Sequence, residues 1–463
     1  TLTLTSGTGL ASNYTLLNGG RTATITVATI STVTGITATN KTYDSNDTAT
    51  LVTSGATFNG MFTNDVLNVA TSAGVFNNAR AAIGKTVSIS GITLGGADAG
   101  NYTLTTSTAS TTATIDPKAL TVTALSQTKV YDSNASVASS ALNVGYGVSG
   151  LVGSESLSGV TLAYSDANVS RDGGGTVLSD KTIVVSAAQA TAGTVLSDYA
   201  ISYVNNTAST ITPYIVSLTG GRVYDATTSV AASTLTIGTL INQETLGLAG
   251  AGTLSDKNVG ENKAVGLGTL TLTSGTGLAS NYTLVDGGRI ATITVANLTV
   301  TTSDVVKTYN GSLSVAGATT APVAIVSGSA TRLFGSDTLS GGSYAFTDAN
   351  AGTGNRTVTV GSVTVNDGFA GGNYNVSYVD NTTSTINRAA ITVSTSNVIK
   401  TYDATTSALG TPVTISGSLF NNVSNGNTTD SLSGGTYAFV GENVSRQGGV
   451  PSGAVLSDKV VTA

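Results

Sequence analysis

The phrase Lys41-Thr42-Tyr43-Asp44 decides the fold of this chain, because near copies of it return at a regular interval. The copies read Lys129-Val130-Tyr131-Asp132, Arg222-Val223-Tyr224-Asp225, Lys307-Thr308-Tyr309-Asn310 and Lys400-Thr401-Tyr402-Asp403. Their tyrosines lie 88, 93, 85 and 93 residues apart. A fixed period of this size indicates an array of small domains and not one large domain. We call this phrase the Lys-x-Tyr motif.

A second phrase, the Asn-Tyr motif, accompanies the first. Its copies are Asn13-Tyr14, Asn101-Tyr102, Asp198-Tyr199, Asn281-Tyr282 and Asn373-Tyr374. The distance from this tyrosine to the next Lys-x-Tyr tyrosine is nearly constant, at 25 to 29 residues, whereas the distance from there to the following Asn-Tyr tyrosine varies from 58 to 68. Loops absorb insertions and packed strands do not. The middle of each unit is therefore predicted to carry the variable loops.

The constant segment between the two motifs predicts where one unit ends and the next begins. Alternating apolar and polar residues lie on both sides of a short break, which holds Pro117 in one unit and Pro213 in the next. A strand needs no ladder hydrogen bond at such a break. The predicted segments are 1–27 (end of a truncated repeat), 28–116 (repeat 1), 117–212 (repeat 2), 213–294 (repeat 3), 295–387 (repeat 4) and 388–463 (repeat 5, truncated).

Composition predicts an all-β fold. The chain is rich in Gly, Thr, Ser, Val and Ala and poor in the residues that favour helices, with 10% charged and 5% aromatic residues. Short strands bounded by Gly, Asn and Asp, repeating every ~90 residues, favour an immunoglobulin-like β-sandwich for each unit. Because the junctions are short, we expect the tandem domains to form an extended rod. A β-grasp-like unit is the alternative, although no convincing helix is present.

The Lys-x-Tyr motif is interpreted as a strand that ends in a turn closed by the Asp carboxylate on nearby amides. The tyrosine is expected to bury its ring and place its hydroxyl on a backbone carbonyl, as in the tyrosine corner of sandwich folds. The residues predicted to mark the repeat structure are Tyr43, Asp44, Tyr131, Asp132, Tyr224, Asp225, Tyr309, Asn310, Tyr402, Asp403, Tyr14, Tyr102, Tyr199, Tyr282 and Tyr374.

Two chemical alternatives compete with this structural interpretation. A Lys–Asn or Lys–Asp isopeptide crosslink would need a lysine amine, and Arg222 occupies that position in repeat 3. Calcium could use the oxygen ligands of Asp166-Ala167-Asn168, Asp348-Ala349-Asn350 and Ser45-Asn46-Asp47. These loops carry too few carboxylates for a typical calcium site, so Asx turns are favoured. The expectation is no cofactor.

The composition argues against catalysis. The chain has no His and no Cys, and its four Glu, at positions 155, 244, 261 and 442, fall singly on loop-like stretches. The alternative is an enzyme in which two acidic residues from different parts of the chain meet in a cleft. The net charge is −6 and the basic residues are scattered, so the sequence has no basic patch that would favour binding of nucleic acid. No apolar run approaches the length of a membrane span.

The motifs together resemble the YDG and MBG-type repeats of filamentous-haemagglutinin-like bacterial exoproteins. The resemblance is carried by the Lys-x-Tyr motif, then Ala97-Asp98-Ala99-Gly100-Asn101-Tyr102, then Ile115-Asp116-Pro117-Lys118-Ala119-Leu120-Thr121-Val122. The usual Gly after Tyr-Asp is Ser or Ala here, and only Tyr309-Asn310-Gly311 approaches it. The resemblance implies repetitive β domains at a bacterial surface, exported by two-partner secretion, with no catalytic residues.

The expected function is structural: a stalk or filament building block of an extracellular adhesin or surface fibre, which associates with copies of itself. The alternative is an array of ligand-binding modules, in which mid-unit loops bind glycans or a host protein. Exposed aromatic residues would support such loops, and the candidates are Phe58, Phe62, Phe334 and Phe420. Residues 1–28 match 269–296 at 25 of 28 positions, which points to duplication of multi-unit blocks.

Overall fold

The computed structural model describes residues 2–17, 19–328, 331–410, 412–457 and 459–462, and these residues form an all-β chain. Within these ranges, helix is confined to three-residue 3-10 turns, so the β-grasp alternative, which requires a packed helix, does not fit. None of these helices could cross a bilayer. The turns are η1 (Ala11–Asn13), η2 (Ala99–Asn101), η3 (Leu196–Asp198), η4 (Ala232–Thr234), η5 (Ile241–Gln243), η6 (Ala279–Asn281), η7 (Val423–Asn425) and η8 (Gln447–Gly449).

The chain divides into two compact units, Thr1–Tyr214 and Ile215–Ala463. In the first unit, repeat 1 contains β1 (Ala28–Ile30), β2 (Thr32–Thr34), β3 (Thr37–Ala38), β4 (Lys41–Thr42), β5 (Thr48–Ala49), β6 (Leu51–Val52), β7 (Thr57–Asn59), β8 (Asn68–Phe76), β9 (Ala82–Gly95), β10 (Tyr102–Leu104) and β11 (Ala109–Asp116). Repeat 2 contains β12 (Lys118–Ala124), β13 (Thr128–Val130), β14 (Tyr146–Ser149), β15 (Leu157–Tyr164), β16 (Lys181–Ala190), β17 (Tyr199–Val204) and β18 (Asn206–Thr212).

The second unit holds the remaining repeats. Repeat 3 contains β19 (Tyr214–Val223), β20 (Ser229–Ala231), β21 (Leu235–Ile237), β22 (Leu246–Ala249), β23 (Ala251–Thr253), β24 (Gly260–Ala264), β25 (Thr271–Ser274) and β26 (Tyr282–Thr294). Repeat 4 contains β27 (Ala296–Thr302), β28 (Val306–Thr308), β29 (Ala324–Val326), β30 (Thr338–Phe346), β31 (Gly352–Asn366), β32 (Tyr374–Tyr378) and β33 (Asn381–Asn387). Repeat 5 contains β34 (Thr392–Thr395), β35 (Ser407–Ala408), β36 (Pro412–Ser416), β37 (Asn421–Asn422), β38 (Thr428–Thr429), β39 (Tyr437–Phe439) and β40 (Val461–Thr462).

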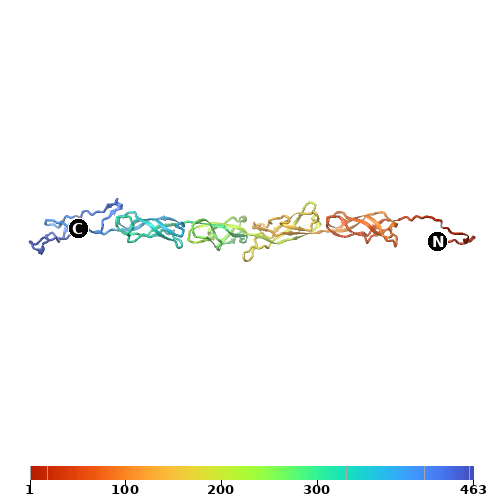
Figure 1. Ribbon diagram of the computed structural model, residues 1–463, viewed down its shortest axis with the longest axis horizontal. Helices are drawn as coiled ribbons and strands as arrows, with labels where there is room; N and C mark the ends of the chain where they lie inside the picture. Colours follow the sequence, from red (N-terminus) through yellow and green to blue (C-terminus); the bar gives the residue numbers. More distant parts are fainter. Residues whose placement is uncertain (1, 18, 329–330, 411, 458, 463) are drawn as a thin grey trace. The chain divides into compact units, whose positions relative to one another are not determined.

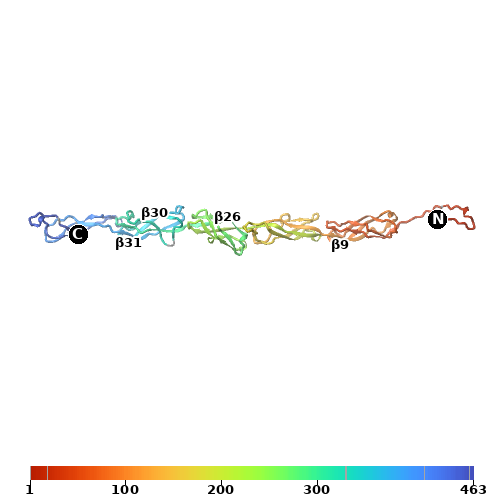
Figure 2. The same ribbon diagram turned by 90° about the horizontal axis from the view of Figure 1, so that it is seen from below.

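Repeats 2 and 4 show the common topology most clearly. Each has two sheets, whose parallel and antiparallel strands lie along a common axis within the repeat (Figure 1). Repeat 4 has the sheets β29-β27-β32 and β28-β33-β31-β30, and repeat 2 has the equivalent sheets β14-β12-β17 and β13-β18-β16-β15. The long hairpin strands β30 and β31 lie side by side (Figure 2). One parallel pair occurs in each sheet: β27 with β32, and β28 with β33.

Many core residues lie on strands along which buried and more exposed positions alternate. On β12, buried and partly exposed residues alternate, so that Leu120 and Val122 are fully buried. This period of two is what a half-buried strand requires. In repeat 4, side chains of β28 and its neighbours pack with those of β31 and β33, for example Val305, Val358 and Ile386 around Phe346.

The strands on either side of three predicted junctions are separated by one residue. Pro117 alone separates β11 from β12, Pro213 alone separates β18 from β19, and Val295 alone separates β26 from β27. At these three junctions the last strand of one repeat leads into the first strand of the next through a single residue, whereas residues 388–391 separate β33 from β34. A single-residue connection has far less freedom than a Gly/Ser tether.

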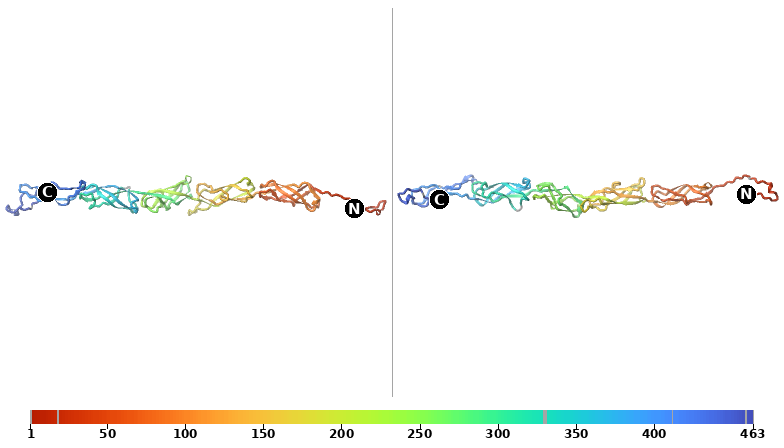
Figure 3. Two further views of the ribbon diagram at one scale, coloured as in Figure 1. Left: turned by 45° about the horizontal axis from the view of Figure 1, so that its top comes forward. Right: turned by 60° about the horizontal axis from the view of Figure 1, so that its bottom comes forward.

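The two duplicated segments, 1–28 and 269–296, differ in burial. In repeat 3, Leu270 and Tyr282 are buried against their own strands. Their equivalents Leu2 and Tyr14 are 90% and 71% exposed. Figure 3 shows the segment before repeat 1 as ribbon without strand arrows. Nearly identical sequences thus differ in strand content and burial at the two places.

The single-residue junction generates a first prediction. Replacing Val295 with Pro is expected to leave the free energy of unfolding within about 0.5 kcal/mol of the parent, because Pro already stands at the equivalent positions 117 and 213. The matched control is Thr301→Pro in β27, which lies opposite Ile325 of β29 inside a strand with neighbours on both sides, where proline removes a ladder donor. Urea unfolding of both variants checks this, and an equal loss of stability in the two would contradict it.

Candidate functional site

The lysine of each Lys-x-Tyr motif holds the turn that follows it. Lys41 Nζ donates to the Asp44 carboxylate at 2.8 Å and to the backbone carbonyls of Asn46 and Thr48 at 2.9 and 3.2 Å. The lysines at positions 129, 307 and 400 make the equivalent bonds three, five and seven residues ahead. One ammonium thus satisfies three acceptors, which fixes the turn.

An aromatic ring lies beneath the ammonium in four of the repeats. Lys307 Nζ is 5.1 Å from the centre of the Phe346 ring, and the other lysines lie 5.7 to 5.9 Å from Phe76, Tyr164 or Phe439. In repeat 3, Arg222 binds Asp225 and the Thr227 carbonyl in the same way. This position therefore serves as a hydrogen-bond donor, and arginine fills the role in part, since the buried Nε of Arg222 has no hydrogen-bond partner.

The predicted side-chain turn is confirmed. The Asp44 carboxylate accepts from the Asn46 amide at 3.1 Å, and the other four motifs make the same bond. The residue after the Asp is left-handed, with φ of 65° at Ser45 and 75° at Gly311. Gly is favoured in this conformation, which gives a physical reason for the Gly of the resembling repeats. At Gly311 a side chain would also collide with the Asn421 carbonyl of repeat 5.

Three of the five Lys-x-Tyr tyrosines, Tyr43, Tyr224 and Tyr309, place their hydroxyls on a carboxylate and not on a backbone carbonyl, so the tyrosine-corner prediction is wrong for these three. Each donates instead to a carboxylate in the middle of the next repeat: Tyr43 to Glu155 at 2.6 Å, Tyr224 to Asp337 at 3.0 Å and Tyr309 to Asp430 at 2.5 Å. The rings of Tyr43 and Tyr224 are buried, as expected. We call these three acids the junction carboxylates. The local sequence pattern does not reveal them, because they lie 112, 113 and 121 residues from their tyrosines.

The Asn-Tyr tyrosine of the next repeat binds the same acid. Tyr374 donates to Asp337 at 2.7 Å and accepts from the Phe334 amide at 2.8 Å. Tyr199 makes the equivalent bonds to Glu155 and the Val152 amide. Two tyrosines from successive repeats thus converge on one carboxylate, and their rings meet edge to face. The ring centres are 5.5 Å apart for Tyr43 and Tyr199, and 5.4 Å for Tyr224 and Tyr374.

The residue before the Asn-Tyr tyrosine adds a second contact to the preceding repeat. Asp198 accepts from the Ala81 amide and from Arg80, both at 2.8 Å, and its carboxylate is buried. In the second unit, Asn373 accepts from the Val259 amide at 2.9 Å and donates to Asn258 at 3.1 Å. The charged pair of one junction is thus replaced by a neutral pair in another.

Burial and the shared acids change the titration of the tyrosines. Burial, followed by the hydrogen bond to Glu155, raises the pKa of Tyr199 to about 12 and raises the pKa of Tyr43 further. The pKa of Tyr374 rises for the same physical reason, with Asp337 as its acid. The charge of Asp337 is partly balanced by Lys257 Nζ at 3.2 Å. The hydroxyls therefore remain protonated donors at neutral pH.

The other predicted marker residues divide between buried and exposed positions. Tyr102 and Tyr282 are buried and bond Asp65 and Glu244 of their own repeats. Tyr131 is 4% exposed, and its amide donates to the Thr212 carbonyl. Tyr402 is 53% exposed, and Tyr14 is mostly exposed.

The aromatic residues proposed for ligand loops mostly pack inside the structure. Phe58 is buried in the core of repeat 1, so its prediction as an exposed loop residue is wrong. Phe334 packs against Tyr224 and Tyr374, while Phe420 packs against Tyr309 with ring centres 6.0 Å apart. Phe62 is 65% exposed. The mid-unit stretches therefore supply junction contacts.

The candidate calcium loops form Asx turns. Asp166 accepts from the Asn168 amide at 2.8 Å and pairs with Lys181, while Asp348 accepts from the Asn350 amide at 2.9 Å and pairs with Arg356. In the described ranges, no three acidic side chains gather as they would around a metal ion. The oxygen ligands that calcium would use here are already bound to amides and cations.

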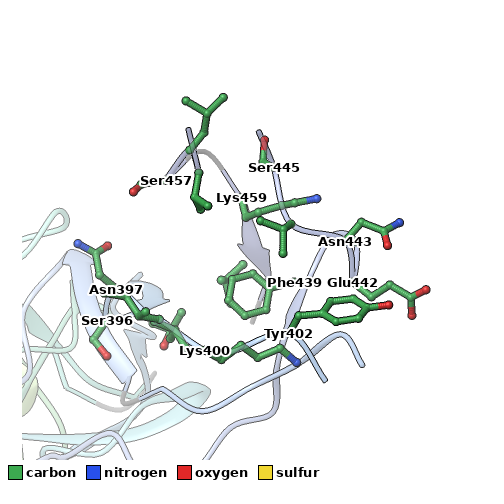
Figure 4. Close-up of a pocket in the computed structure, with 18 of the residues that line it drawn as sticks. Ser396, Asn397, Lys400, Tyr402, Phe439, Glu442, Asn443, Ser445, Ser457 and Lys459 are labelled. Atoms are coloured by element: carbon green, nitrogen blue, oxygen red, sulfur yellow. The ribbon is translucent and has the colours of Figure 1, made fainter. Parts of the chain in front are cut away.

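A cavity of about 510 Å³ lies in repeat 5 beside Lys400, Tyr402, Phe439 and Glu442 (Figure 4). In repeats 1, 2 and 4, the strand of the Lys-x-Tyr motif pairs in parallel with the last strand of its own repeat. Residues 388–410, 412–457 and 459–462 include no equivalent strand. The cavity therefore lies where that strand would pack, and we do not treat it as a ligand site.

The turns generate a prediction on pH. The Lys400 ammonium and the Thr405 amide lower the pKa of Asp403 from 3.8 to about 2. Since the folded value lies below the unfolded one, the turn is stabilised above about pH 4 and loses this contribution as the pH falls towards 2. The Thr405 amide should lose hydrogen-exchange protection in that window. The Ser312 amide, bound to the untitratable Asn310 side chain at 3.2 Å, is the control, and a parallel loss at both amides would contradict the assignment.

The junction carboxylate generates a second prediction. Tyr224→Phe removes one of the hydroxyls bound to buried Asp337 and should cost about 1–3 kcal/mol, because a buried acceptor loses a donor. Hydrogen exchange should locate the loss in repeats 3 and 4. Tyr14→Phe, at an exposed ring, is the matched control and should change stability by less than about 0.5 kcal/mol. Equal effects of the two variants would contradict a role for the junction.

Three of the repeats also match a known protein family. The family model of the YDG domain matches residues 26–111, 206–289 and 294–384, which together exceed half of the chain. A search of the curated proteins returned no match. Repeat 2 lies mostly outside the matched segments, yet its strands pair as those of repeat 4 do. The chain therefore belongs to the YDG domain family.

Proposed function

We propose that this chain is a structural repeat array of a bacterial extracellular adhesin or surface fibre. It acts as a stalk or filament building block in attachment or biofilm, and it associates with copies of itself. The observation that carries the proposal is the junction carboxylate, which recurs between successive repeats as Glu155, Asp337 and Asp430. A contact that recurs at three junctions couples the neighbouring repeats there and resists bending, as in other repeat arrays.

The proposal also draws on how the polar chemistry of the repeats is used. The buried acids bind tyrosines, amides or lysines of the fold, as Asp198 and Asp337 do. The strands run from repeat to repeat through single residues such as Pro117 and Val295. Both features serve rigidity. The family resemblance adds the expectation of a cell-surface location and export by two-partner secretion.

The ligand-binding alternative has less support, because Phe334 and Phe420, two of its aromatic candidates, pack at junctions. Its remaining candidate is the exposed ring of Phe62. Binding of the chain to a glycan array, lost in Phe62→Ala and retained in Tyr14→Phe, would favour that alternative over a purely structural role.

Small-angle scattering tests the structural role. A compact chain of this length would have a radius of gyration of roughly 23 Å, and a stiff array should give a value at least twice that. The triple variant Tyr43→Phe, Tyr224→Phe, Tyr309→Phe should bend at its junctions and shorten the maximum dimension, whereas Tyr14→Phe should not. A parent chain as compact as a single globule would overturn the proposal. Display of the chain between a membrane anchor and an epitope then measures whether it raises the epitope above the cell surface.

A further inference from the structure

At each of two junctions, a pair of tyrosines shares one carboxylate. The Tyr224 and Tyr374 hydroxyls both donate to Oδ2 of Asp337, at 3.0 and 2.7 Å. The Tyr43 and Tyr199 hydroxyls donate to the two oxygens of Glu155. Because each pair shares one carboxylate, the hydroxyl-bearing edges of its rings converge. The carbons next to the hydroxyls, where oxidised phenols join, therefore lie near the shared carboxylate, in rings whose centres are 5.4 and 5.5 Å apart.

The composition leaves tyrosine as the main site of one-electron oxidation. The chain has no Cys, no Trp, no His and a single Met, against 17 Tyr. An oxidant that removes electrons from this protein thus generates tyrosyl radicals. The four tyrosines of the two pairs are at most 6% exposed, so water and diffusing reductants have little access to a radical formed there.

We propose that the pairs Tyr43–Tyr199 and Tyr224–Tyr374 are sites of oxidative dityrosine crosslinking, which joins successive repeats covalently. The bond would link residues far apart in sequence but adjacent across a junction. This proposal rests on the junction geometry and goes beyond the structural role proposed above.

The chemistry balances with two equivalents of a one-electron oxidant, such as a haem peroxidase intermediate or a photogenerated ruthenium(III) complex. Each ring loses one electron, and its phenolic proton passes to the shared carboxylate and on to water. The two radicals form a carbon–carbon bond between positions ortho to the hydroxyls. The two ortho hydrogens then move to the phenolic oxygens, which restores both phenols. The net loss is two electrons and two protons.

The carboxylate has a defined part in this step. A hydroxyl that already donates to a carboxylate can release its proton as the electron leaves, so no separate base is required. Each acid also holds both rings in place before oxidation, which makes the coupling intramolecular. Tyr309 provides an internal comparison, since its hydroxyl binds Asp430 but its ring faces Phe420.

The test uses the whole chain at low concentration, oxidised with a photogenerated ruthenium(III) complex and persulfate, then digested and analysed by mass spectrometry. The expected products are the peptide pairs containing Tyr43 with Tyr199 and Tyr224 with Tyr374, each lighter by two hydrogens than the sum of its parts. Tyr43→Phe should abolish the first product and leave the second, and Tyr224→Phe should do the reverse. Each variant is thus a folding control for the other pair.

A further variant separates proton acceptance from ring placement. Glu155→Gln should lower the yield of the first product several-fold while the second product is unchanged. Crosslinks dominated by exposed tyrosines such as Tyr14 and Tyr402, or formed only between molecules, would overturn the proposal. A negative result here leaves the scattering of the unoxidised chain unaffected, so it is distinguishable from failure of the structural role.

Discussion

A carboxylate shared by tyrosines of two successive repeats is the interaction on which the junctions depend. A carboxylate can accept about four hydrogen bonds, and burying it without donors is costly. Asp337 receives Tyr374 from its own repeat, Tyr224 from the preceding repeat, and Lys257. One repeat alone therefore leaves the acid incompletely satisfied. The stability of a repeat includes a contribution that only its neighbour can supply.

This dependence links two motifs that serve different ends of a repeat. The Lys-x-Tyr motif places its tyrosine where the repeat ends, and the lysine fixes the turn that supports it. The Asn-Tyr motif faces the preceding repeat through both of its residues, as Asn373 and Tyr374 show. Variation in loop length falls between the motifs, in the stretch that also carries Glu155, Asp337 and Asp430, so insertions there must leave these acids in contact with the tyrosines.

The fold was predictable from the sequence to a considerable extent. Alternating residues and the isolated prolines Pro117 and Pro213 predicted the strands and their junctions, and Asp followed by small polar residues predicted the turns, because these features depend on local geometry. The partner of the Tyr43 hydroxyl was not predictable in this way, since Glu155 lies on another repeat and no local period marks it. A signal was nevertheless present: an acid occurs in the middle of every unit, at Asp65, Glu155, Glu244, Asp337 and Asp430.

The two ends of a repeat carry complementary groups, and this has an evolutionary consequence. Each complete repeat carries a tyrosine donor at one end and an acceptor acid at the other, so a copied block already fits the block beside it. Gene duplication can then lengthen the protein without any new recognition surface having to arise. The match of residues 1–28 with 269–296 at 25 of 28 positions is the trace of such copying. Copy number becomes a quantity that selection can adjust, while the chemistry of each joint stays the same.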